Sequence, residues 1–128
     1  MAEERNIYTL GHDKDKVGDV KIAHEIFGVI AGLAATEVDG VSALAGNIKH
    51  EDVAKISTKN LARGVKVNVM DTSASVELAV VMDYGYSIPK VSAQIQERVK
   101  QALEGMTGLT VIDVNIRIEG VNIDKSKQ

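Results

Sequence analysis

The residue types that most often carry chemistry are scattered along this chain of 128 residues. The three histidines, His12, His24 and His50, share no metal-ligand spacing on one element. His24 and Glu25 spell half of a zincin motif, but Gly28 stands where the second histidine belongs. The absence of cysteine removes disulfides, thiolate nucleophiles and cysteine-bound zinc. We therefore expect no metal, no cofactor and no enzymatic activity.

Two further patterns that resemble functional motifs have simpler explanations. Asp83 beside Tyr84, at the end of a predicted strand, is a candidate acid pair, although polar residues at strand ends are commonly turn formers. Gly105-Met106-Thr107-Gly108 matches the GxxG loop by which KH domains clamp a nucleic-acid backbone. Here it leads into a predicted strand and contains no lysine or arginine, so a glycine-flanked helix end explains it better.

A basic segment lies in the middle of the chain, between Asn47 and Gly64. Lys55, Lys59 and Arg63 recur every four residues, which would align them on one helix face. Within this segment we expect a short helix over Glu51 to Ser57. A solvated loop is one interpretation of this segment, and a docking patch for an acidic partner or for anionic lipid head groups is the other.

Composition indicates one globular domain with an aliphatic core. Hydrophobic residues make up 45% of the chain, charged residues 26% and aromatic residues only 3%, with a net charge of −3. The scarcity of aromatic residues counts against surfaces that stack bases. A slightly acidic chain also lacks the positive charge that nucleic-acid binding by counterion release requires. Nucleic acid is therefore not the expected partner.

Neither secretion nor a membrane span is expected from the apolar pattern. The first residues are acidic and polar, with no apolar signal region behind them. The longest apolar stretch, from Ile26 to Ala35, is about ten residues, whereas a bilayer requires about 20. We expect a cytoplasmic protein.

The first half of the chain predicts a strand over 17–22 and a helix over 23–38 that ends at Asp39-Gly40. This helix is apolar on every side, so it should be covered on every side. Internal packing against the sheet is one explanation. The other is a contact with a second subunit or a partner, for which Phe27, Gly28 and Gly32 are the candidate residues, together with Lys55, Lys59 and Arg63.

The second half predicts alternating strands over 65–69, 76–84 and 112–118, a connection over 71–75, and a helix over 89–104. Residues 41–46 form a short strand or a connection. The expected fold is a two-layer α+β domain at 17–122 with a mixed or antiparallel sheet, after a flexible lead-in at 1–16 and before a solvated tail at 123–128. Both helices should cover one sheet face. The other face should be open and carry Lys66, Asn68, Glu77, Asp83, Asp113, Asn115, Arg117 and Glu119.

Several segments together resemble a known family. They read Met82-Asp83-Tyr84-Gly85-Tyr86-Ser87-Ile88-Pro89 and Met106-Thr107-Gly108-Leu109, preceded by Ile30-Ala31-Gly32-Leu33 and Val38-Asp39-Gly40-Val41. Their order and spacing over residues 16–122 resemble the alkaline shock protein family of envelope stress response proteins of Gram-positive bacteria. In this resemblance Gly85 and Pro89 shape the entry to the second helix, and Gly105 and Gly108 shape its exit.

The resemblance implies a non-enzymatic cytoplasmic protein that self-associates. It further implies a partner, either a membrane anchor that holds it at the inner face of the cell membrane or an enzyme of lipid metabolism. The function expected is a scaffold or regulator of the envelope stress response or of lipid metabolism. The alternative is an RNA-binding module that uses the open sheet face.

Overall fold

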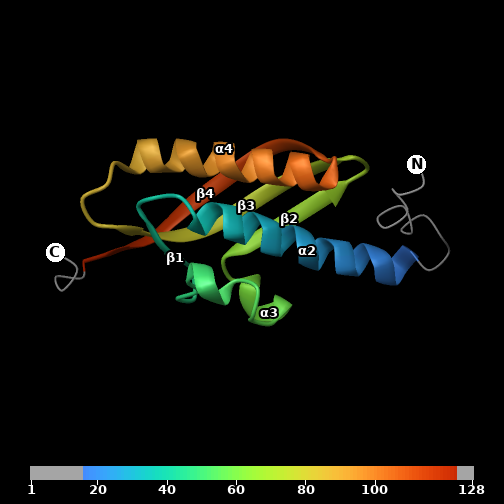
Figure 1. Cartoon of the computed structure of the whole chain (residues 1–128), viewed down its shortest axis with the longest axis horizontal. Helices are drawn as coiled ribbons and strands as arrows, with labels where there is room; N and C mark the ends of the chain where they lie inside the picture. Colours follow the sequence, from blue (N-terminus) through green and yellow to red (C-terminus); the bar gives the residue numbers. More distant parts are fainter. Residues whose placement is uncertain (1–15, 124–128) are drawn as a thin grey trace.

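The computed structural model describes the backbone of residues 16–123 and the side chains of residues 25–123. Nearly all of the expected lead-in at 1–16 and of the expected tail at 123–128 lies outside these residues. The elements follow one another as shown in Figure 1. They are α2 (Lys16–Thr36), β1 (Val41–Leu44), η2 (His50–Asp52), α3 (Thr58–Leu61), β2 (Val65–Met70), β3 (Ser73–Asp83), α4 (Ile88–Thr107) and β4 (Thr110–Asn122).

Two layers make up the fold, with α2 and α4 lying side by side over one face of a four-stranded sheet (Figure 1). Helix α4 packs on β4, and α2 packs on β2 and β1. The predicted two-layer α+β class, with both main helices on one face, is confirmed. Alternation within the strands produces it, because residues two apart point to the same side of a sheet.

Strand β3 is the centre of the sheet. Strand β4 runs parallel to it along one edge, with Ala79 opposite Arg117. Strands β2 and β1 both run antiparallel along the other edge, one after the other, with Val65 opposite Leu78 and Leu44 opposite Val80. Strands β1 and β2 therefore lie end to end along the same edge of β3, and residues 45–64 leave the sheet between them. This segment, which contains η2 and α3, is called the excursion below.

Aliphatic side chains fill the space between the helices and the sheet. On β3 they come from alternate positions, and on α4 they follow the helical period. The larger side chains of these two elements that are fully or almost fully buried are Val76, Leu78, Val80, Met82, Val91, Ile95, Val99 and Leu103. No polar or charged residue among 25–123 is buried. Hydrophobic burial is thus the main term that holds the described domain together.

The prediction of a strand over 17–22 is wrong, because α2 already begins at Lys16. The alternation of these residues is weak, and extending an existing helix requires no new nucleus, whereas a strand here would need its own pairing partner. The helix also ends at Thr36, before the predicted end at Val38. Gly40, with φ of 101°, then forms the turn into β1 rather than the helix cap.

The predicted helix over Glu51 to Ser57 is also wrong. A single 3-10 turn, η2, covers His50–Asp52, and the next helix, α3, starts only at Thr58. Ser57 is the N-cap of α3, where its hydroxyl accepts a hydrogen bond from the Asn60 N–H at 3.3 Å. Serine favours this role over a helix interior, because its side chain satisfies an N–H that the first turn leaves unpaired.

The connection predicted over 71–75 is shorter in the structure. Only Asp71 and Thr72 lie between β2 and β3, with Asp71 at φ of 63°, and Ser73 already belongs to β3. Asparagine and aspartate tolerate this left-handed conformation better than other non-glycine residues.

Helix α4 confirms its predicted start and corrects its predicted end. The Ser87 hydroxyl accepts from the Lys90 N–H at 3.4 Å, and Pro89 lies in the first turn. The helix continues past Gly105 to Thr107 and stops at Gly108, whose φ is 77°. Met106 continues the helical spacing of the core-facing residues but is 68% exposed in this added turn.

The last strand begins earlier than predicted and contains a bulge. Its register shifts between Val111 and Asp113, so that Val111 is buried and Ile112 is 65% exposed. A bulge inserts one residue and reverses the alternation on either side of it. Strict alternation over the predicted strand 112–118 would place Ile112 toward the core, and this is wrong, whereas Val114, Ile116 and Ile118 lie against the core as the alternation requires.

Candidate functional site

No cluster with metal-binding chemistry occurs in the part of the chain that the structure describes. Residues 25–123 contain no group of three or more histidine, aspartate or glutamate residues that could hold a metal ion. The side chain of His24 and the whole of His12 lie outside the described side chains. His50 is exposed and lies far in sequence from the other two.

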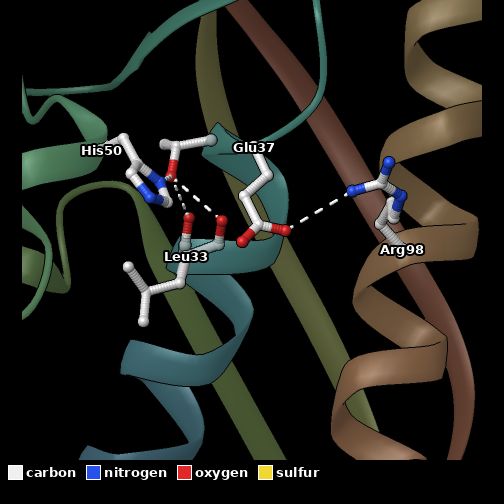
Figure 2. A network of polar contacts seen from close by, with 6 residues as sticks. Leu33, Glu37, His50 and Arg98 are labelled. Carbon is white, nitrogen blue, oxygen red and sulfur yellow. Dashed lines mark hydrogen bonds and ion pairs between the residues drawn. The ribbon is translucent and has the colours of Figure 1, made fainter.

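His50 belongs to a small polar network at the end of α2 (Figure 2). Its Nδ1 lies 2.8 Å from the Thr36 hydroxyl, which itself lies 2.7 Å from the Gly32 carbonyl oxygen. On the other side of the same helix end, Glu37 pairs with Arg98 of α4 at 3.4 Å. These contacts join the excursion and α4 to the end of α2, and His50 takes part in the one between the excursion and the helix.

The glycines of α2 that were predicted as contact residues lie against the excursion of the same chain. A Cβ added at Gly32 would lie 3.0 Å from Val53 Cγ1, and one added at Gly28 would lie 3.8 Å from Leu61 Cδ2. Phe27 is half-buried and packs against the core. Internal packing therefore accounts for the small residue at 32, whereas a Cβ at 28 would make an ordinary contact. A subunit contact through this helix stays a prediction.

The three basic residues of the excursion are all exposed but do not share a helix. Lys55 precedes α3, Lys59 lies within it, and Arg63 follows its end. Their four-residue spacing therefore does not produce one charged helical stripe. Arg63 instead lies beside the sheet, where it lines a depression on the open face.

This depression has a volume of about 150 Å³ and lies where β2, β3 and β4 meet the end of the excursion. Its lining includes Arg63, Lys66 and Arg117 with a single carboxylate, Glu77. The open face was predicted to carry Lys66, Glu77 and Arg117, and all three are exposed there. The sequence interpretation missed that Arg63 joins them, because it placed Arg63 with Lys55 and Lys59.

A second surface, also missed from the sequence, is a group of exposed apolar side chains at one end of the molecule. The residues of this apolar end patch are Tyr84, Tyr86, Ile88, Val121 and Ile123. They come from the β3–α4 connection, the first residue of α4 and the end of β4, and the Tyr84 N–H donates to the Asn122 carbonyl at 3.0 Å between the connection and β4. Exposed apolar groups that lie together commonly mark interaction sites.

The outer edge of β4 adjoins this patch. Strand β4 pairs only with β3 within residues 16–123, so its other edge has no strand partner there. Helix α4 covers the first half of that edge, where Glu104 accepts from the Val111 N–H at 2.9 Å and Gln96 donates to the Val114 carbonyl at 3.0 Å. Alternate residues of a strand direct their backbone groups to the same edge. Ile116 and Ile118 therefore also direct their N–H and C=O groups to the outer edge, beyond the part that α4 covers.

None of the helices in the described residues is both long enough and apolar enough to cross a membrane.

Comparison with known proteins finds clear relatives of this chain. The sequence model of the alkaline shock protein 23 family, described as having a cell envelope-related function, matches residues 12–123. The chain is 37% identical over 126 residues to a Bacillus subtilis (strain 168) protein named YqhY, and the match covers 98% of this chain and 93% of that protein. It is 29% identical over 105 residues to a stress response regulator gls24 homolog of Streptococcus pyogenes serotype M3, covering 79% of this chain and 57% of that relative.

Among solved structures, a variant of MamM-CTD is similar with a TM-score of 0.48 at 15% sequence identity. The similar region covers 77% of this chain and 95% of that one.

Proposed function

This chain belongs to the alkaline shock protein 23 family, whose function is related to the cell envelope, and we propose that it is a non-enzymatic scaffold or regulatory protein within that family. It acts in the envelope stress response or in lipid metabolism through self-association and through protein partners. The relative named as a stress response regulator supports the first of these settings. The protein works in the cytoplasm, at the inner face of the cell membrane where a membrane-anchored partner holds it.

The observation that carries this proposal is the half of the β4 edge, beside the apolar end patch, that has no strand partner among residues 16–123. A strand edge offers a row of unpaired N–H and C=O groups, and a second extended strand satisfies them. Val121 and Ile123 add apolar contact area next to that edge. A second copy of the chain that pairs its own β4 here would extend the sheet and bury both features at once.

Size-exclusion chromatography with light scattering tests this proposal. The full chain at tens of micromolar is expected to run as a dimer or a larger assembly. The double substitution Val121→Lys with Ile123→Lys should convert it to a monomer, because a buried lysine without a partner is strongly unfavourable. Ile112→Lys is the matched control, since Ile112 is similarly exposed on the same strand but outside the apolar end patch.

A wild-type chain that is strictly monomeric at that concentration would contradict self-association. Equal effects of the control and of the double substitution would instead place the contact elsewhere.

RNA binding by the open sheet face is less well supported. The aromatic side chains described in the structure belong to α2 and to the β3–α4 connection, so none of them is available for base stacking on that face. A gel-shift assay at low salt distinguishes the two functions, because tight and salt-sensitive binding of single-stranded RNA would favour the RNA-binding module.

A further inference from the structure

Three cationic side chains from separate parts of the chain surround the depression on the open face. Arg63 comes from the end of the excursion, Lys66 from β2 and Arg117 from β4. The floor is low because Gly64 and Ala79 lie in the middle, with the Ala79 N–H donating to the Gly64 carbonyl at 2.9 Å. These five residues and Glu77 are called the cation pocket below.

Register explains why long and short side chains alternate here. Ala79 lies on β3 directly opposite Arg117 of β4, and in the next row Lys66 of β2 lies opposite Glu77 of β3. A methyl group between two strands that carry long basic side chains leaves a hollow bounded by those side chains. The concavity is thus built into the pairing of the sheet.

Two of the three cations have no partner among the side chains of residues 25–123. Within that range, Arg63 and Lys66 make no ion pair and no side-chain hydrogen bond, although Lys66 is the cross-strand neighbour of Glu77. Arg117 pairs through its Nε with Glu119 at 2.6 Å, which leaves the two terminal nitrogens of its guanidinium available. With three cations and one carboxylate, the lining carries a surplus of positive charge, and such a concavity attracts anions.

Size and charge together select the kind of anion. A volume of about 150 Å³ is large enough for a phosphate group, and because the depression is open to solvent, the rest of an ester can extend outward from it. A phosphate ester carries nearly two negative charges at neutral pH, which matches the surplus better than a single carboxylate does. Arginine is also the side chain best suited to bind phosphate oxygens in pairs.

We propose that the cation pocket binds the phosphate group of a phosphate monoester, with Arg63, Lys66 and Arg117 donating to its oxygens. The site lies on the open sheet face rather than on the β4 edge. It therefore adds a ligand to the proposed scaffold and does not depend on self-association.

Nuclear magnetic resonance titration of the full chain with inorganic phosphate, at constant ionic strength maintained with sodium chloride, tests the site. The backbone amide signals of Gly64, Lys66 and Ala79 should shift and saturate. Arg63→Gln with Arg117→Gln should weaken binding by about tenfold or more, because two charge-assisted donors are lost. Glu77→Gln should strengthen it by about fivefold, the effect expected from removing one like charge at close range.

The matched control is Lys90→Gln with Lys100→Gln, which removes two exposed charges from α4 and should leave the affinity unchanged. Shifts that rise linearly without saturation would overturn the site. So would equal losses in the control and pocket variants, or no gain from Glu77→Gln. All substituted residues are exposed, and thermal melting confirms that each variant is folded.

Two sources of the phosphate monoester are separated by a second pair of probes. Glycerol 3-phosphate represents a free ester, and phosphatidylcholine vesicles containing phosphatidic acid represent a membrane-borne one. If the unsubstituted chain binds one of these probes and the variant Arg63→Gln with Arg117→Gln does not, that probe identifies the source of the phosphate group. Failure in both arms would overturn the proposal, and neither outcome bears on the oligomeric state.

Discussion

The two faces of the sheet differ in almost every physical property. The covered face presents Val76, Leu78 and Val80 to the helices and contains no buried polar group in the described residues. The open face presents charged side chains around small ones, and two of its cations have no partner among residues 25–123. The covered face therefore supplies stability, since its side chains leave water on folding. The exposed side chains of the open face contribute little to stability. They can therefore serve binding without a loss of the fold.

Adjacent residues on β4 provide the largest contrast between the faces. Val114→Asp should abolish the folded protein, because an unpaired carboxylate would be forced into the core. Asn115→Asp, one residue further on the open face, should lower the free energy of unfolding by no more than about 1 kcal/mol, because the new carboxylate meets Glu77 and loses its bond to Asp113 only at an exposed site. Urea unfolding followed by circular dichroism measures both. Comparable losses at the two positions would refute the assignment of faces.

The covered side also includes the contact between α2 and the excursion. Gly32→Val should destabilise the protein by about 1–3 kcal/mol, because the added side chain would overlap with Val53. Gly28→Ala should instead stabilise it by up to about 1 kcal/mol, since the site has room and alanine favours a helix.

Thermal unfolding distinguishes these two outcomes. Dissociation of the assembly by Gly28→Ala, with stability preserved, would instead show that this side of α2 faces a second subunit.

The cap of α4 contributes a smaller amount at the end of the helical layer. Ser87→Ala should lower the free energy of unfolding by about 1 kcal/mol, because the Lys90 N–H loses its acceptor. Ser87→Asp serves as the control and should retain the cap. Chemical denaturation measures the free energy of unfolding of the three proteins, fitted with a common dependence on denaturant concentration. An alanine variant as stable as the unsubstituted protein would show that water replaces the cap.

The ion pair between α2 and α4 should have the smallest effect. Both side chains of Arg98 and Glu37 are 54% exposed, so solvent screens their interaction. Arg98→Ala, Glu37→Ala and the double variant should give a coupling energy of no more than about 1 kcal/mol, decreasing with added salt. A larger coupling, or one insensitive to salt, would indicate a buried pair.

Elements with a regular pattern are predicted well from the sequence, and elements that depend on neighbours are not. The alternation through Val76, Leu78 and Val80 and the helical spacing of Val91, Ile95 and Val99 each identify the element and the side that is buried. The prediction of a strand over 17–22 is wrong because its alternating pattern is short and weak, and these residues instead form the first turns of α2.

The candidate surfaces were predicted only in part for a similar reason. Lys66, Glu77 and Arg117 were assigned to the open face because alternation alone determines the face of a strand residue. Nothing in the local pattern around Arg63 indicates that it lies near Arg117, 54 positions later in the chain. The apolar end patch also requires the end of β4 to meet the β3–α4 connection, which is a contact between distant segments.

By itself, the sequence determined that this protein has an aliphatic core, two main helices, strands with one polar face, and an α4 that starts near Pro89 and ends among glycines. These properties follow from periodicity and capping, which act over a few residues. Only the tertiary structure decided that β1 and β2 share one edge of β3, that β4 runs parallel along the other, and that Arg63 joins Lys66 and Arg117. The choice of strand partner and register depends on how the whole core packs, which no single segment specifies.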